Sequence, residues 1–453
     1  MRVLSATLCF VGVSKAYPDF LNPVFADNVN ARLWRTALSG PSIVDDEQGW
    51  PHYTQGAYNN TPQESLPPGQ YVKTDASGWT SGFFPDSLWQ AYRRRTELKS
   101  RDDFPGEPSA EDWLSMADAW TSPLQTNANL TDTHDLGFLA KPFESAMRIQ
   151  KTDAYLPVLQ NMSQNLAARF SPAAGIIRSW DCTNGSSSSW CSHEDSVLVI
   201  IDNMMNLALL ARSASIYTHN STLLDIAISH ADKTIQHHVR PDGSSYHVCD
   251  YNGTTGDVYL CRTAQGLADE STWARGQAWG IYGFAEFYSF TRDPAYLATS
   301  KRMADWFIDH LPEDGLPFWD FDAEYLPNVT PRDSSAAAIA ASGMLLLQQQ
   351  IDESRDACRG GRDYKPAAEG LLRATVELAL AGEVSFVDSP PIGAETYANT
   401  PANSSVSRGF ESILMHATSN NNPRADLKNF DSGLSYGDFY FVEAGNRLLE
   451  WED

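Results

Sequence analysis

Two aspartates, Asp135 and Asp202, each open a run of apolar or small residues. Asp135 stands in residues 133–138, THDLGF, and Asp202 in residues 201–206, IDNMMN. A carboxylate set against an apolar segment loses solvation, which raises its pKa, and a second carboxylate nearby acts in the same direction. If the fold brings the two together, one would hold a proton near neutral pH while the other stays ionised. Acid-catalysed chemistry on sugars needs such a pair.

Each aspartate also has a plainer interpretation as a helix N-cap, a position that Asp fills readily. His134 is either a donor that faces a ligand or a satisfied core histidine. Residues Asp202, Met205 and Asn206 share one face of a helix by their spacing, which would place an amide one turn from the acid.

A third segment, residues 271–281, STWARGQAWGI, carries Arg275 between Trp273 and Trp279. Arginine offers a fork to a carboxylate and tryptophan offers a flat face to a sugar ring. The alternative is an arginine paired with a buried acid between two core tryptophans. The chain has no GxSxG, P-loop, GxGxxG or HExxH motif, so serine, phosphate and zinc chemistry lack support. We therefore expect no metal site and no cofactor.

Similar segments recur along the chain and predict the elements that position these residues. Six times a Gly-, Asp- or aromatic-rich opening leads into an apolar helical run, at residues 78–89, 133–139, 202–210, 271–281, 333–343 and 434–444. The openings are roughly 55 to 70 residues apart until a longer last gap, the length of two helices and two loops. The stretches between them have apolar residues at spacings of three and four, typical of amphipathic helices.

Six buried helices, each followed by an amphipathic partner, predict an all-α chain with an (α/α)6 barrel. We expect a single barrel domain over residues 17–453, with the chemical residues around one mouth where the inner helices begin. The alternative is an open helical array in which those residues only cap helices.

The N-terminus predicts a secreted protein. A basic start, a short apolar run and small residues at the cleavage position indicate a signal peptide over residues 1–16. Eight N-glycosylation sequons follow, at Asn59, Asn129, Asn161, Asn184, Asn220, Asn252, Asn328 and Asn403. We expect an extracellular glycoprotein without a membrane span.

The cysteines fit an oxidising compartment. Without Cys9 in the signal peptide five remain, and the spacing predicts two local bridges, Cys182 with Cys191 and Cys249 with Cys261. Cys358 is left over. The net charge of −24 argues against a nucleic-acid partner or an anionic membrane surface.

Together the segments resemble the unsaturated glucuronyl hydrolases of glycoside hydrolase family 88. The resemblance covers most of the mature chain and is carried by GWTSGF, HDLGF, DNMMNL, STWARGQAW and YGDFY, in that order. It implies an (α/α)6 barrel that removes the 4,5-unsaturated uronic acid which polysaccharide lyases leave at the non-reducing end of oligosaccharides. These uronic-acid-capped oligosaccharides are the expected partners, and the enzyme is expected to be a monomer or weak dimer.

The resemblance also implies roles for single residues. Asp202 takes the general acid/base position and Asp135 that of its partner carboxylate. The sugar-binding residues implied are Trp79, His134, Trp180, His247, Gln265, Trp273, Arg275 and Trp279. The family's hydration mechanism has Asp202 protonate C4 of the C4=C5 double bond.

Three other functions remain open at this stage. An unsaturated rhamnogalacturonyl hydrolase would share the barrel and an equivalent acid. A polysaccharide lyase on a similar toroid would need a Tyr or His base and would create the double bond instead of consuming it. A glycan-binding protein would show affinity without turnover.

Overall fold

A computed structural model describes residues 17–40, 49–54, 66–98, 104–181, 191–354, 361–388 and 407–451. The predicted signal peptide lies outside these ranges, as do Cys182, Cys358 and the sequons at Asn59, Asn184 and Asn403. The signal peptide and the domain boundary at residue 17 therefore stay predictions.

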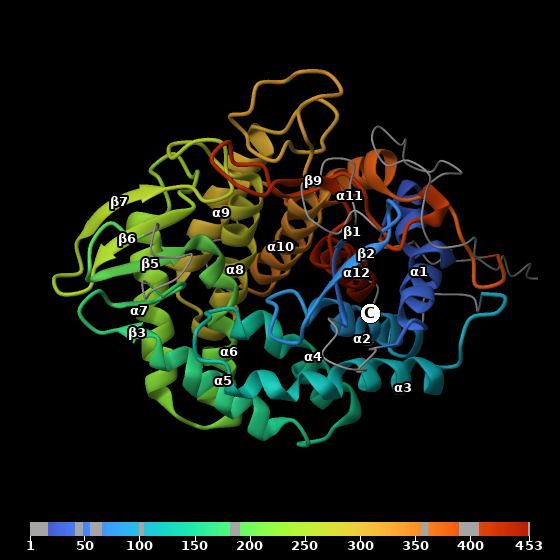
Figure 1. Cartoon of the computed structure of the whole chain (residues 1–453), viewed down its shortest axis with the longest axis horizontal. Coiled ribbons are helices and arrows are strands. Elements are labelled where there is room, and N and C mark those ends of the chain that lie inside the picture. The colour runs from blue at the N-terminus through green and yellow to red at the C-terminus, as the bar shows by residue number, and fades with distance from the viewer. Residues whose placement is uncertain are drawn as a thin grey trace, which may run out of the picture.

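Six helices form a closed inner ring. Each helix contacts the next along the ring, and the last packs against the first. Every one begins in one of the six predicted segments: α2 (Phe83–Thr96), α4 (Leu136–Gln150), α6 (Leu207–Arg212), α8 (Ala274–Thr291), α10 (Ser334–Glu353) and α12 (Ser435–Glu450). Figure 1 shows them in the centre of the molecule.

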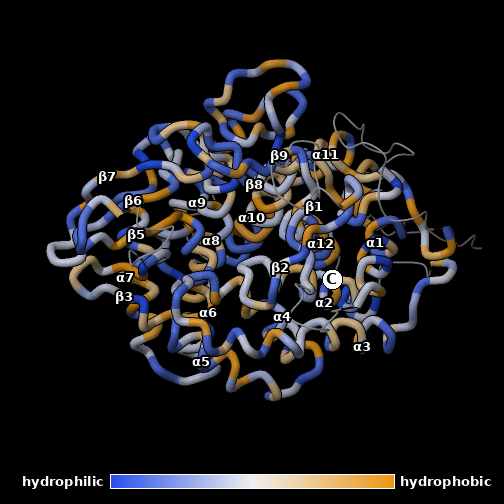
Figure 2. Tube along the Cα trace, in the orientation of Figure 1, coloured by the Kyte–Doolittle hydropathy of each residue, from blue (hydrophilic) through white to orange (hydrophobic). Residues whose placement is uncertain are grey.

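A second set of helices alternates with the first along the chain and lies at the periphery of Figure 1. Its members mix hydrophobic and hydrophilic residues along their length, as α3 and α5 show in Figure 2. They are α1 (Asp27–Ala37), α3 (Ala110–Thr121), α5 (Leu156–Ala168), α7 (Ser221–His237), α9 (Pro294–Asp309) and α11 (Lys365–Ala379). The predicted (α/α)6 barrel is confirmed, and the open array is wrong because the ring closes.

Small residues let the inner helices approach closely. The run of alanines and Ile339 in the first half of α10 is fully buried, and a Cβ on Gly343 would lie 3.0 Å from the Cα of Tyr282 on α8. Helices covered on both faces are apolar all round. One hydrophobic cluster extends from Leu21 to Leu449, so both ends of the described chain share a core.

Short strands and short 3-10 or π helices precede or connect the barrel helices, and the sequence analysis predicted none of them. The strands pair as four small antiparallel sheets: β1 (Trp50–Thr54) with β2 (Tyr71–Thr74), β3 (Phe170–Ser171) with β4 (Ile176–Ile177), β5 (Ser196–Ile200) with β6 (Val248–Asn252) and β7 (Val258–Arg262), and β8 (Ala417–Asn420) with β9 (Asn429–Ser432). The short helices are 3-10 segments η1 (Asp19–Phe25), η2 (Ser122–Asn129), η4 (Ile201–Met205) and η7 (Ser407–Gly409), and the π segment η5 (Ser213–Tyr217).

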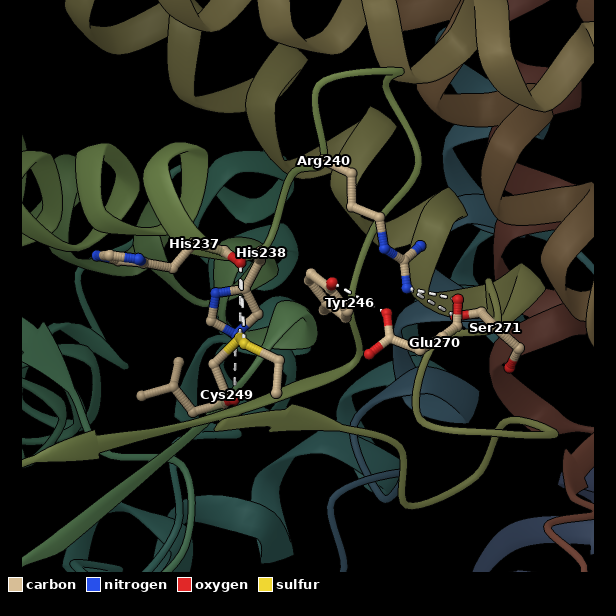
Figure 3. The surroundings of a disulfide bond; sticks show 9 residues. His237, His238, Arg240, Tyr246, Cys249, Glu270 and Ser271 are labelled. Atoms are coloured by element: carbon tan, nitrogen blue, oxygen red, sulfur yellow. Dashed lines mark hydrogen bonds between the residues drawn. A yellow bond between two sulfur atoms is a disulfide. The ribbon is translucent and has the colours of Figure 1, made fainter. Parts of the chain in front are cut away.

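The disulfide between Cys249 and Cys261 is confirmed and joins β6 to β7 at directly opposed positions. Figure 3 shows it beside the carbonyl of His237, which lies 3.6 Å from the Cys249 sulfur. Cys191 is disulfide-bonded as well, but its predicted partner lies outside the described residues. The second pairing therefore stays a prediction.

The described sequons differ in exposure. Asn129, Asn161, Asn220 and Asn328 are exposed, whereas Asn252 is half-buried. The Asn252 side-chain oxygen accepts hydrogen bonds from two backbone N–H groups of its own turn. In the described part of the chain, every helix is too short or too polar to cross a membrane.

Candidate active site

The starts of the six inner helices meet around one mouth of the ring. Contacts between residues at successive helix starts run all the way round: Phe83 with Phe138, Phe138 with Asn206, Ile201 with Gly276, Arg275 with Asp333, Ser335 with Gly437, and Tyr436 with Phe83. Trp79, His134, Asp135, Asp202, Trp273 and Arg275 lie in or just before these starts, whereas Trp180, His247 and Gln265 come from the segments next to the strands β5, β6 and β7.

Neither aspartate caps its helix through its side chain. Asp135 holds the N-cap position of α4 without a side-chain capping bond, and Asp202 is the second residue of η4, after the N-cap Ile200. The capping interpretation is therefore wrong for both side chains. The carboxyl groups are left for other contacts.

A close approach between α4 and the third inner segment brings the two aspartates together. A Cβ on Gly137 would lie 2.5 Å from the Cα of Asn206, so only glycine fits there. The backbone N–H of Phe138 donates to Asn206 Oδ1 at 3.1 Å. The amide predicted near the acid thus joins two inner helices, and the charge of Asp135 reaches Asp202.

Asp202 is the carboxyl most altered by this environment. It is 7% exposed, and burial raises its pKa to about 7. That value includes every contribution: after burial, the Arg275 guanidinium lowers the pKa, the negative charge of Asp135 raises it and the Trp279 indole N–H lowers it. Its Oδ2 has no hydrogen-bond partner among the described residues. Asp202 can hold a proton near neutral pH and present it to a ligand.

His247 lies beside Asp202 because β6 pairs with β5. The backbone N–H of Ile201 donates to the His247 carbonyl at 3.0 Å, and His247 Nε2 is 4.0 Å from Asp202 Oδ2. The imidazole stacks on Trp273 with ring centroids 4.1 Å apart. Burial lowers the pKa of His247 well below its usual value, so the ring is neutral.

His134 stands in a comparable place beside Asp135. Its Nε2 is 3.3 Å from Asp135 Oδ1, and Thr133 donates to the other carboxylate oxygen at 2.7 Å. His134 is 1% exposed, and burial lowers its pKa. The two site histidines therefore each face one of the two carboxyl groups.

Arg275 is held by partners within the chain. Its guanidinium lies 3.3 Å from Asp333 Oδ2, and it donates to the carbonyls of Thr418 and Ser419. The pairing with a buried acid, considered as the alternative, is thus what the structure shows. The positive charge still acts on Asp202. Gln265 donates to the same Ser419 carbonyl at 2.9 Å.

The loop before α8 is fixed from outside the ring. Arg240 donates to the carbonyls of Glu270 and Ser271, at 2.9 and 3.1 Å (Figure 3). These bonds hold the chain that leads into Trp273 and Arg275.

Aromatic side chains cover the mouth. Trp79 lies 4.9 Å from Tyr436 between ring centroids, and Trp279 lies 5.2 Å from Phe138. The Arg275 guanidinium lies 4.4 Å from the centre of the Trp273 ring. Trp180 packs in a separate cluster, against the sheet residues Leu198, Ile200 and Val248. The sugar-binding roles of these residues stay predictions.

The sequence analysis missed several residues of this site. Asp333, which binds Arg275, is the first residue of the fifth recurring segment of the sequence, as Asp202 is of the third, and this shared position could have indicated it. Tyr436 is buried over Arg275, and burial raises its pKa to about 12. In the described part of the chain, no group of three or more His, Cys, Asp or Glu side chains could hold a metal ion.

Fold and site together define a glycoside hydrolase of the (α/α)6 class. No family model matches the chain, but curated proteins do. The chain is 33% identical to an unsaturated glucuronyl hydrolase of Formosa agariphila, over 87% of this chain and 86% of that protein. It is 30% identical to an unsaturated chondroitin disaccharide hydrolase of Streptococcus pyogenes serotype M1, over 83% and 82%. The chain belongs to the unsaturated glucuronyl hydrolase family.

Solved structures agree over nearly the whole chain. An unsaturated glucuronyl hydrolase specific for heparin is 29% identical, with a TM-score of 0.71 and coverage of 95% of this chain and 97% of that one. A substituted unsaturated glucuronyl hydrolase in complex with dGlcA-Glc-Rha-Glc is 26% identical, with a TM-score of 0.72 and coverage of 94% and 96%.

Proposed function

We propose that this enzyme removes the 4,5-unsaturated uronic acid from the non-reducing end of lyase-generated oligosaccharides, with Asp202 as the acid. The observation that carries the proposal is the buried Asp202 carboxyl, whose pKa is raised to about 7 next to a second carboxylate. A group with a pKa near the working pH is an efficient general acid.

The substrate's C4=C5 bond is a vinyl ether, because C5 also carries the ring oxygen. The Asp202 hydroxyl gives its proton to C4, the double bond supplies the electron pair, and positive charge develops at C5 and the ring oxygen. Water then adds at C5 and gives a proton to the Asp202 carboxylate, which restores the acid. The resulting hemiketal opens by breaking the bond between C5 and the ring oxygen, which leaves a ketone at C5 and a hemiacetal at C1. This hemiacetal collapses to an aldehyde and releases the rest of the oligosaccharide as an alcohol.

Asp135 has two roles in this proposal. Its negative charge helps to keep Asp202 protonated in the free enzyme. The same charge favours the positive charge that develops on the sugar ring, an electrostatic contribution to catalysis. His134 and His247 each face one of these carboxyl groups through Nε2.

The subsite for the rest of the oligosaccharide is a separate question. The sequence pattern contains no clear Ser/Lys cluster of the kind associated with sulfated substrates, so we propose a preference for unsulfated glucuronyl units. Relatives bear the names of heparin and chondroitin substrates, so unsaturated disaccharides from both polymers are suitable probes. Strong turnover of sulfated disaccharides with little turnover of unsulfated ones would contradict the preference.

The ultraviolet absorbance of unsaturated disaccharides tests the function directly, because hydration consumes the conjugated double bond. We expect wild type to remove this absorbance and Asp202→Asn to leave it unchanged. Asp225→Asn, on the exposed face of α7, is the control and should behave like wild type. Activity only on rhamnogalacturonan-derived oligosaccharides, or binding without turnover, would overturn the proposal.

We further propose that the protein is secreted as a glycosylated monomer or weak dimer. The predicted signal peptide and the sequons support secretion. Protein recovered from the medium should lose mass when its N-glycans are removed enzymatically, and sedimentation should give its oligomeric state. Retention of unglycosylated protein in the cell would contradict secretion.

A further inference from the structure

Two buried hydroxyl groups lie behind the two site histidines. Ser179 is fully buried and Thr263 is 2% exposed. Each hydroxyl contacts the Nδ1 atom of a histidine whose Nε2 atom faces a carboxyl group of the site. Neither residue belongs to the sugar-binding set implied by the sequence.

Ser179 acts on His134. Its Oγ accepts a hydrogen bond from the Ile200 N–H at 3.0 Å and lies 3.1 Å from His134 Nδ1. Among the described residues His134 Nδ1 is the one acceptor within reach of the Ser179 hydroxyl hydrogen, so we assign the hydroxyl as the donor and Nδ1 as the acceptor. A neutral imidazole carries one hydrogen, so that hydrogen sits on Nε2. It faces Asp135 Oδ1 at 3.3 Å.

Thr263 acts on His247 in the same way. Its Oγ1 accepts from the Gly266 N–H at 2.8 Å and lies 3.2 Å from His247 Nδ1. The Ala264 N–H also donates to Nδ1, at 3.3 Å. The hydrogen of this neutral ring is thus also on Nε2, directed at Asp202 Oδ2, 4.0 Å away.

We propose that Ser179 and Thr263 are positioning residues that fix both site histidines in the Nε2–H tautomer, so that each ring presents an N–H to a catalytic carboxyl. This inference rests on the proposed roles of Asp202 and Asp135. The opposite tautomer would place a lone pair against each carboxyl. On Asp202 that lone pair would bind the proton meant for the sugar, and on Asp135 it would repel the negative charge.

The tautomers can be read directly from ring-nitrogen NMR of protein labelled at histidine, assigned with single histidine variants. Wild type should show His134 and His247 in the Nε2–H form. Ser179→Ala should give His134 a share of the Nδ1–H form. Thr263→Val should give His247 a smaller share, because the Ala264 N–H still donates to its Nδ1. A wrong tautomer misplaces a donor at the reacting groups, so kcat should fall about 10- to 100-fold with KM within about threefold.

Matched variants separate positioning from general destabilisation. Thr263→Ser keeps the hydroxyl and should retain the wild-type tautomer and most of kcat. Thr375→Val removes a buried hydroxyl that bonds only to its own outer helix, and it should keep wild-type kcat. If Ser179→Ala does not fold, the Thr263 pair still decides.

Two results would overturn the inference. One is unchanged tautomers in both Ser179→Ala and Thr263→Val. The other is a changed tautomer with wild-type kcat. Since the NMR signal needs no substrate, it stands apart from the proposed function, whose failure would show as turnover by Asp202→Asn.

Discussion

The proposed chemistry of this enzyme depends on one carboxyl group, that of Asp202, whose raised pKa lowers its tendency to ionise. Asp202 is polar enough to face a sugar and buried enough to keep its proton near neutral pH. Burial is the largest cause of this change, and the charge of Asp135 adds to it, while Arg275 limits it. The position of Arg275 is in turn set by Asp333.

The pH dependence of kcat/KM should therefore report Asp202. Because the protonated form is the acid, kcat/KM should fall as the pH rises through about 7. Asp135→Asn removes a charge that raises this pKa, so the residual activity should fall at a lower pH than in wild type. Initial rates at low substrate concentration, followed by ultraviolet absorbance over a pH series, measure both. A falling limb that stays in place in Asp135→Asn would contradict the coupling of the two aspartates.

The free energy of unfolding should also depend on pH through Asp202. Asp202 has a pKa of about 7 when folded and about 3.8 when unfolded, so the folded state binds more protons between these values. The free energy of unfolding contributed by this group therefore falls as the pH rises from about 4 to about 7, by about 4 kcal/mol at most.

Asp202→Asn removes this dependence. Thermal unfolding should show the variant with a higher Tm than wild type at pH 8 and a smaller difference near pH 4. Equal differences at both pH values would mean that Asp202 is not held protonated.

At the scale of elements, the site depends on how closely α4 approaches η4. Gly137→Ala would add a Cβ 2.5 Å from the Cα of Asn206 and force the two inner segments apart. We expect a loss of about 1–3 kcal/mol in the free energy of unfolding, with a clear fall in kcat because Asp135 and Asp202 separate.

Gly370→Ala is the control for this change. It lies in α11 on an exposed face with nothing within 4 Å of the added Cβ. Alanine should stabilise this helix by about 0.5–1 kcal/mol and leave kcat unchanged. Chemical denaturation and steady-state kinetics on both variants test the pair. Wild-type kcat in Gly137→Ala would show that the close approach does not position the aspartates.

The sequence predicted the elements better than their contacts. The six inner helices and the Cys249–Cys261 bridge could be predicted from local patterns, because each depends on residues that lie close together in the sequence. The strand β5, the pairing of Arg275 with Asp333 and the hydroxyls of Ser179 and Thr263 depend on residues far apart in the chain. Burial of polar side chains at a ring mouth is a tertiary property, so their partners could not be predicted from spacing alone.

The whole molecule surrounds this site with negative charge. Asp and Glu number 57 against 33 Lys and Arg, which gives a net charge of −24 for an enzyme whose proposed substrate is also an anion. Close to the carboxyl groups, Arg275 supplies a positive charge. Its guanidinium group, however, already binds two backbone carbonyls and Asp333. Long-range repulsion should therefore slow the approach of the substrate.

Ionic strength tests this balance. Salt screens charges that lie more than about 10 Å apart at 0.1 M, while contacts within the buried mouth are screened much less. Raising sodium chloride from about 10 to 150 mM should therefore increase kcat/KM, with a larger increase for a disulfated than for an unsulfated disaccharide. The kcat at saturating substrate should stay constant and serves as the control. A decrease of kcat/KM with salt, steeper for the more highly charged substrate, would instead show that local cations at the mouth outweigh the charge of the whole protein.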